Sequence, residues 1–301
     1  MNFINTLLFI LLGAVWGSAF IFMRVITPYF GAVGTAVSRM LIGGTALLLF
    51  FRALKVDMRW RKNLRHYAIV GILNSAVPFL LFAFAIMRLP AVIPAVVNSL
   101  SPLAGAVLSF LILKENLTIR KILGLLFGVA GVALIAFRGV GLSGKPDALA
   151  LLACIFTPIS YGFAAVYMKR WASDVPPRPM TAASLTLGGL GLAPFLLLSP
   201  PTAIQIPLAI WAAAIVFGLL CTAFGFYLYY YLISTSGVTP TLSVSLLIPL
   251  FAFFWSYLFL GETVTLPVAA GCCIVLTGTA LVIFGAKKAT RPPSPSRSAS
   301  S

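Results

Sequence analysis

Polar and aromatic side chains occur inside long apolar segments of this sequence, where they could bind a small polar molecule. Asn98 and Ser245 each stand four residues before a proline, which places them one helical turn from it. An amide and a hydroxyl beside such a kink could hold the amino and carboxyl groups of a zwitterion. We therefore predict a substrate-binding set made of Trp16, Ser18, Asn74, Asn98, Ser101, Ser160, Tyr161, Tyr227, Tyr230, Ser243 and Ser245.

A structural role is the alternative for each of these residues. A serine or threonine within a helix often bonds its own backbone, and polar side chains also join helices to one another in membranes. In a binding role, the aromatic rings of Trp16 and Tyr161 could pack an apolar part of a ligand. The binding role and the structural role both stay open at this point.

Three further charged residues could contact a ligand or act as a gate. Glu115 and Glu262 end their apolar segments at matched positions, where they could gate a path or accept the free amides of the next helix. Arg39 lies nearly three turns into its segment. It could bind an anionic group or extend towards lipid headgroups.

The chain offers little for catalysis or metal binding. Its acids are Asp57, Glu115, Asp147, Asp174 and Glu262, all at or near the ends of apolar segments, so a carboxylate proton relay is not supported. The single histidine, His66, lies in a basic connection. The cysteines, Cys154, Cys221, Cys272 and Cys273, form no CxxC pattern and read as packing residues. We expect no enzyme, no metal and no cofactor, since HExxH, paired intramembrane carboxylates and a Ser/His dyad are lacking in the sequence.

The elements that carry these residues must lie in lipid. Apolar residues make up 61% of the chain, charged residues 9%, and mean hydropathy is +1.08. Soluble domains carry about 25% charged residues. The net charge of +16 comes from basic residues in short connections between apolar runs. That placement argues against nucleic acid as a partner and favours contact with anionic lipid.

Segments of about twenty apolar residues predict transmembrane helices. We place ten spans, with the first expected to be a retained helix rather than a signal peptide. They are 5–23, 30–51, 67–87, 91–113, 119–137, 147–169, 180–199, 208–233, 238–260 and 266–285. The polar, proline-rich end from Arg291 onward is expected to be disordered.

The distribution of basic residues predicts the orientation. Sixteen of the 21 lysines and arginines fall on the side that holds both termini, four fall on the other side, and Arg39 lies within a span. Because cytoplasmic loops are enriched in lysine and arginine, we expect both termini to lie in the cytoplasm. The expected location is the cell (inner) membrane.

The sequence also repeats itself. At a shift of 147 positions Pro102 meets Pro249 and Glu115 meets Glu262, and at a shift of 145 Trp16 meets Tyr161. We predict a first repeat at 1–138, a second at 139–286 and a tail at 287–301. Two copies of a five-span unit must enter the membrane from opposite sides. The fold class predicted is therefore all-α integral membrane, with ten helices in two inverted five-helix repeats, an arrangement typical of secondary transporters.

Prolines and glycines interrupt spans at corresponding places in the two halves. Span four holds Pro94 and Pro102, span nine holds Pro249, and Pro78 in span three corresponds to Gly225 in span eight. A proline removes a backbone donor and bends its helix, and the freed carbonyl needs another partner or a wet cavity. We therefore predict a central cavity lined by spans three, four, eight and nine.

Several motifs make a family resemblance specific over nearly the whole chain. The segment 16–20 (WGSAF) resembles the opening of EamA-type members of the drug/metabolite transporter superfamily. Segment 113–118 (LKENLT) resembles the family's signature at the end of span four, and segment 260–265 (LGETVT) repeats it. Arg39 resembles the family's arginine early in span two. Lys114 and Tyr161 depart from the family's pattern. The resemblance implies ten helices in two inverted repeats, and export or exchange of small metabolites.

Together these patterns predict a secondary transporter that works by alternating access through a midplane cavity. The expected substrate is a small uncharged or zwitterionic metabolite, such as an amino acid, moved by facilitated diffusion, exchange or coupling through its own charge. Membrane lipids are the other expected partner, and the protein is expected to be a monomer or homodimer. The alternative is a lipid or lipid-linked-sugar translocase, which would present a groove open to lipid instead of a closed cavity.

Overall fold

All elements of the computed structural model are helices, and it describes residues 2–135, 147–199, 205–263 and 265–285. In the first half they are α1 (Phe3–Ala53), α2 (Trp60–Gly71), the π-helical η1 (Ile72–Ala76), α3 (Val77–Ile86), α4 (Val92–Asn98), α5 (Ser101–Leu113) and α6 (Ile119–Leu134). In the second half they are α7 (Ala148–Trp171), α8 (Pro177–Leu192), η3 (Ala193–Leu197), α9 (Leu208–Val216), the π-helical η4 (Phe217–Phe224), α10 (Gly225–Ser236), α11 (Val238–Leu242), η5 (Ser243–Leu246), α12 (Ile248–Trp255), η6 (Ser256–Leu260) and α13 (Leu266–Gly285).

The described helices accommodate the predicted membrane spans. Eight helical runs are long and apolar enough to cross a bilayer. The first of them, α1, has 51 residues and holds two spans, because one straight helix of that length would be about 76 Å long. The shorter α6 begins where the fifth span was predicted, and that span's predicted end lies outside the described residues.

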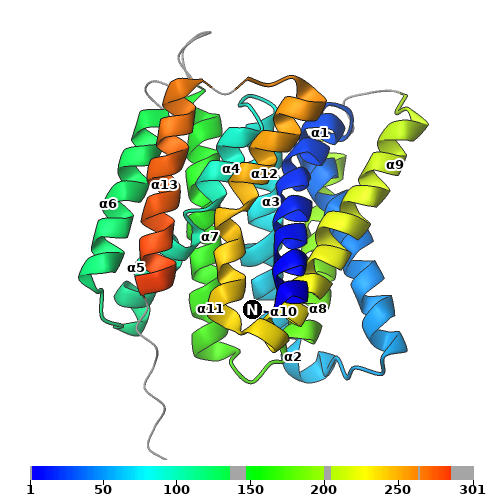
Figure 1. Ribbon diagram of the computed structural model, residues 1–301. Helices are drawn as coiled ribbons and strands as arrows, with labels where there is room; N and C mark the ends of the chain where they lie inside the picture. Colours follow the sequence, from blue (N-terminus) through cyan, green and yellow to red (C-terminus); the bar gives the residue numbers. More distant parts are fainter. Residues whose placement is uncertain (1, 136–146, 200–204, 264, 286–301) are drawn as a thin grey trace, which may run out of the picture.

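The turn within α1 differs from the prediction. The predicted spans 5–23 and 30–51 put the break at 24–29, but helical structure continues through Pro28 and the chain turns at Gly31. Gly31 has φ +69°, which glycine adopts without a steric penalty. In Figure 1 the two arms of α1 run side by side for only part of their length and then diverge.

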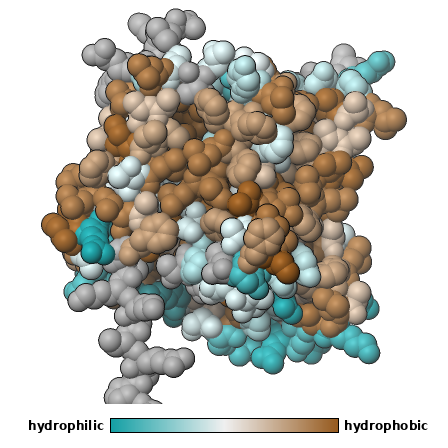
Figure 2. Space-filling model, viewed as in Figure 1, coloured by the Kyte–Doolittle hydropathy of each residue, from teal (hydrophilic) through white to brown (hydrophobic). Residues whose placement is uncertain are grey.

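The surface has an apolar belt, as a membrane protein requires. Leu126, Phe254 and Leu258 are among the exposed apolar side chains. Figure 2 shows apolar colour across the middle of the molecule and polar colour concentrated along the edge where α1 begins and α13 ends. Arg59 and Lys62 belong to that edge. We call it the basic side and the other edge the opposite side. The chain is therefore a multi-pass membrane protein.

Contacts between the halves come in exchanged pairs. A Cβ added at Gly124 would lie 2.6 Å from the carbonyl oxygen of Gly278, and one at Gly131 would lie 2.7 Å from that of Gly271. The 147-residue shift converts the first contact into the second. These glycines let α6 and α13 pack backbone to backbone at one flank of the bundle (Figure 1).

A second pair of contacts follows the same rule in another part of the bundle. Gly43 packs on Gly218, and Gly188 packs on Gly71. This exchange of equivalent partners is the pattern that two inverted repeats produce. The predicted boundary at 138/139 and the tail 287–301 lie outside the described residues.

The helical breaks also match between the halves. The π-helical segment η1 precedes Pro78, and η4 precedes Gly225. Span four is interrupted between α4 and α5, and span nine contains the 3-10 segment η5 before α12. Pro102 has no N–H for the carbonyl of Asn98, and the Ser101 hydroxyl donates to that carbonyl instead, at 2.6 Å.

Candidate substrate cavity

A cavity of about 690 Å³ lies between the two halves. Its walls come from spans one to four and six to nine, so the four predicted spans contribute together with four others. No residue of α6 or α13 is among the lining residues that the structure describes. The paired helices at the flank therefore serve as scaffold, and the broken helices shape the cavity.

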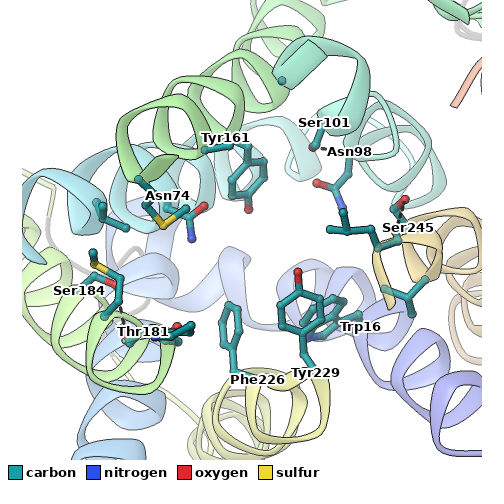
Figure 3. A pocket seen from close by; sticks show the side chains of 18 of the residues that line it. Trp16, Asn74, Asn98, Ser101, Tyr161, Thr181, Ser184, Phe226, Tyr229 and Ser245 are labelled. Carbon is teal, nitrogen blue, oxygen red and sulfur yellow. Dashed lines mark hydrogen bonds between the residues drawn. The ribbon is translucent and has the colours of Figure 1, made fainter. Parts of the chain in front are cut away.

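Polar groups from opposite walls point into the cavity. Figure 3 shows the hydroxyls of Tyr161 and Tyr229 and the amides of Asn74 and Asn98 directed towards the same space. The remaining polar lining residues are Arg39, Ser101, Lys169, Ser173, Thr181, Ser184, Tyr230 and Ser245. Such a set offers hydrogen-bond donors and acceptors on several sides of a small molecule.

Aromatic rings form much of the remaining wall. Trp16 contacts Tyr229 with ring centroids 5.4 Å apart and meets Phe226 edge-on at 5.8 Å. Gly225 permits this position, since a Cβ there would lie 2.5 Å from the indole nitrogen of Trp16. Phe20 and Phe82 meet edge-on at 5.6 Å on the opposite-side wall. The cavity can thus pack an apolar group beside its polar ones.

Arg39 is the buried cation of the cavity wall, with 8% of its surface exposed. Its Nε donates to the hydroxyl of Thr222 at 3.0 Å. Its guanidinium carbon lies 3.9 Å from the ring centre of Phe79 and 4.7 Å from that of Phe217. Burial on this scale is inconsistent with a side chain that extends to the headgroups.

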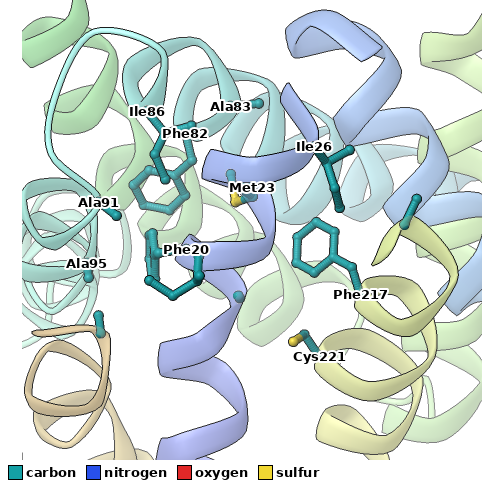
Figure 4. Close-up of a cluster of buried hydrophobic side chains, with 14 of the residues drawn as sticks. Phe20, Met23, Ile26, Phe82, Ala83, Ile86, Ala91, Ala95, Phe217 and Cys221 are labelled. Carbon is teal, nitrogen blue, oxygen red and sulfur yellow. The ribbon is translucent and has the colours of Figure 1, made fainter. Parts of the chain in front are cut away.

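The cavity is closed towards the opposite side by a packed apolar cluster. Figure 4 shows Phe20 and Phe82 beside Ile86 and Ala91, and Ile26 beside Phe217, all members of this cluster. These side chains are almost completely buried. A solute in the cavity would have to displace them to leave on that side.

An ion pair lies beyond the apolar cluster. Arg24 Nε is 3.7 Å from Glu262 Oε1, and the backbone N–H of Ala91 donates to Glu262 Oε2 at 3.0 Å. Arg24 also donates to the carbonyl of Ile86. Glu262 therefore caps the start of α4. One of its two expected roles was to cap the helix that follows it in sequence, and the structure shows a different helix in that place.

Towards the basic side the lining continues to the ends of the helices. Lys169 and Ser173 near the end of α7 and Pro177 at the start of α8 belong to it. Lys169 Nζ lies 2.5 Å from Glu115 Oε1, and 63% of the lysine side chain is exposed. This second ion pair is the repeat equivalent of the first, because Arg24 corresponds to Lys169 and Glu115 to Glu262.

The structure brings eight of the predicted site residues together in the cavity wall: Trp16, Arg39, Asn74, Asn98, Ser101, Tyr161, Tyr230 and Ser245. It places the others elsewhere. Ser18 donates to the carbonyl of Val15, and Ser160 to that of Leu73. Ser243 donates to the carbonyl of Pro240, and Tyr227 packs edge-on against Phe50 with 44% of its surface exposed. The contacts of these four residues are with other parts of the protein, as expected for a structural role.

Sequence reasoning missed Tyr229, Thr181, Ser184, Lys169 and Ser173. A signal existed for Ser184, since the 145-residue shift aligns it with Arg39. Tyr229 carries none, because it stands in a run of aromatic residues in which any member could face the cavity.

Comparison with known proteins agrees with this architecture. A model of the EamA-like transporter family matches residues 4–137 and again residues 148–284. A solved crystal structure shares the fold with a TM-score of 0.64 and 20% identity, over 94% of this chain and 97% of that one.

Curated relatives align over nearly their whole length. The uncharacterized transporter YvbV of Bacillus subtilis (strain 168) is 28% identical over 283 residues, which cover 92% of this chain and 91% of that protein. The "Probable terminal-alkyne amino-acid exporter" of Streptantibioticus cattleyicolor is 25% identical over 269 residues, which cover 89% of each. With two matches of the family model that together span most of its length, the chain belongs to the EamA-like transporter family.

Proposed function

We propose that this protein is a secondary transporter that exports or exchanges small metabolites, amino acids or similar compounds, by alternating access. The observation that carries the proposal is the cavity between the repeats. Its volume of about 690 Å³ falls within the range of small-molecule sites, roughly 300–1,000 Å³. Its mixture of amides, hydroxyls and rings suits a compact polar molecule with an apolar part.

One further observation supports the substrate class, and another bears on the driving mode. One relative carries a name that specifies amino-acid export. Among the described residues that line the cavity, none is an aspartate or glutamate, so a proton-coupled carboxylate is not part of the proposal. Facilitated diffusion, exchange or coupling through the charge of the substrate remain as the proposed driving modes.

The proposed location is a cell inner membrane with both termini in the cytoplasm. The basic side would then face the cytoplasm, and the cavity, which reaches Lys169 on that side, would be inward-facing. Reporter fusions at each terminus test the orientation. A reporter active only outside the cytoplasm should stay inactive at both ends.

The first test of function is thermal stability of the purified protein with amino acids, nucleosides, sugars and amphipathic amines. A ligand at 100 times its dissociation constant stabilises the folded state by about 2.7 kcal/mol. Stabilisation by one chemical class supports the proposal and selects the compound for flux assays in proteoliposomes. Stabilisation by phospholipids alone contradicts it and favours a lipid translocase.

Replacing Asn98 with alanine is expected to lower flux of the selected compound at least about tenfold, because the amide points into the cavity and its hydrogen bonds to substrate would be lost. Trp16→Ala is expected to act similarly through lost ring contact. Ser243→Ala is the matched control, since that hydroxyl bonds the carbonyl of Pro240. Equal flux in Asn98→Ala and Ser243→Ala would show that the amide does not bind substrate.

A further inference from the structure

Arg39 is a buried charge that pairs with none of the chain's acidic side chains. The chain has five acidic side chains, all of them described, and each is paired with another base. The pairs are Asp57 with Arg59, Glu115 with Lys169, Asp147 with Arg88, Asp174 with Lys62, and Glu262 with Arg24. Arg39 therefore faces the cavity without a counter-ion among the acidic residues of the chain.

The contacts of Arg39 use little of its hydrogen-bonding capacity. A guanidinium carries five N–H donors, and the structure gives its Nε one acceptor, the hydroxyl of Thr222. The other close neighbours are the rings of Phe79 and Phe217, which attract the charge but are not acceptors in the plane of the guanidinium. A buried charge is costly unless it is paired, and an intramembrane one marks a functional site more often than a scaffold.

The second repeat shows that the crossing of α1 with η4, where Arg39 meets Thr222, does not need this arginine. The 145-residue shift aligns Arg39 with Ser184, and the 147-residue shift aligns Thr222 with Ser75. Both serines are buried, so the equivalent crossing is built with two small hydroxyls. The close packing of Gly43 on Gly218 recurs there as Gly188 on Gly71. The first half therefore carries a charge at this crossing, and the second half forms the equivalent crossing without one.

We propose that Arg39 is the anion-binding group of the cavity and that the transported molecule carries a carboxylate. A carboxylate accepts two parallel N–H bonds from the edge of a guanidinium, and the apolar part of the molecule packs on Trp16 and Phe79. The inference rests on the proposed function, whose substrate class it narrows. A substrate whose only charge is positive is disfavoured, because the cavity charges among the described lining residues are Arg39 and Lys169.

The test uses compounds that share a body and differ in charge. Phenylalanine has an amine and a carboxylate, hydrocinnamate the carboxylate alone, phenethylamine the amine alone, and phenylalaninamide the amine with a neutral amide. Leucine, isocaproate, isoamylamine and leucinamide form a second set. Binding is measured as the shift in melting temperature and as inhibition of flux of the compound selected by the wider panel. The expected result is binding by the carboxylate-bearing members and at least about tenfold weaker binding by the others.

Variants link that selectivity to one side chain. Arg39→Gln should lose the preference for carboxylates, and Arg39→Lys should recover part of it, because an ammonium keeps the charge but not the paired donors. Arg65→Gln is the charge-matched control, since Arg65 is exposed on the basic side and lies outside the cavity. If Arg39→Gln does not fold, the wild-type compound sets still decide whether a carboxylate is required, and the partial loss in Arg39→Lys decides whether Arg39 binds it.

The possible failures separate the two proposals. If amides or amines bind the wild type as well as the acids do, or if Arg39→Gln keeps the preference, the assignment of Arg39 is overturned while transport stands. If no compound of the wider panel or of either set changes the melting temperature or is transported, the proposed function fails and this inference fails with it.

Discussion

Replacing Glu262 with glutamine is expected to open the opposite side of the cavity to solutes far more often than in the wild type. Glu262 joins Arg24, at the end of the first span, to the start of α4 through the N–H of Ala91. Its side chain is 18% exposed, so these charged contacts are only partly screened. Charged hydrogen bonds contribute about 1.5–3 kcal/mol. Loss of the lower value changes a population ratio roughly tenfold.

The equivalent variant on the basic side should change access much less. Glu115→Gln removes the contact with Lys169, but that contact is formed while the cavity extends to Lys169 on this side, so it does not hold the basic side closed. This lysine is largely exposed, and exposed pairs contribute about 0–1 kcal/mol. The same residue pair, repeated in each half, thus gives effects of unequal size. A general loss of stability would not produce that difference, because both variants remove one ion pair.

The measurement uses a cysteine reporter in the cavity, Ser245→Cys, in a chain whose four native cysteines are replaced by alanine. A membrane-impermeant maleimide is added from one side at a time. Glu262→Gln should raise the labelling rate from the opposite side, and Glu115→Gln should leave it nearly unchanged. Asp57→Asn is the control, because its pair with Arg59 is exposed and neither residue lines the cavity. Equal labelling in Glu262→Gln and Asp57→Asn would refute a gating role.

The second large effect is expected on stability, from leucine in place of Gly124 or Gly131. At each position a Cβ would lie under 3 Å from a backbone oxygen of α13. Backbone atoms cannot rotate aside as side chains can, so the two helices must separate. Overpacking costs about 1–3 kcal/mol where side chains can adjust, and we expect a cost at or above the upper value here.

Thermal melts of the detergent-solubilised protein measure this effect. Gly124→Leu should lower the melting temperature clearly, or prevent recovery of folded protein. Gly191→Leu is the matched control, because a Cβ there meets nothing within 4 Å. Any folded Gly124→Leu protein should bind ligand with unchanged affinity, since α6 and α13 do not contribute to the described cavity wall. A melting temperature equal to that of the control would contradict the packing argument.

The sequence by itself determined the features that depend on local pattern. Apolar length marked the spans, and the shared positions of Pro102 and Pro249 marked the repeat and the broken helices. These inferences succeed because span length is set by bilayer thickness and because proline acts on its own backbone. The match of Glu115 with Glu262 was equally visible, since it needs only the alignment of the chain with itself.

Tertiary structure alone decided which side chains meet. In water a polar face separates the exposed side of a helix from the buried one. In lipid both sides are apolar, so the pattern does not tell which way a residue points. Tyr227 and Tyr229 illustrate this, because neighbouring positions of one helix put the first towards Phe50 and the second into the cavity.

The partners of the charged side chains likewise could not be predicted from the sequence. Arg24 meets Glu262, and Arg39 meets Thr222, across most of the chain length. No local rule selects such partners, because the packing of the two inverted halves brings them together. The sequence could name Arg39 as a candidate for an anion contact, and the fold supplied its burial and its lack of a carboxylate among the chain's acidic residues.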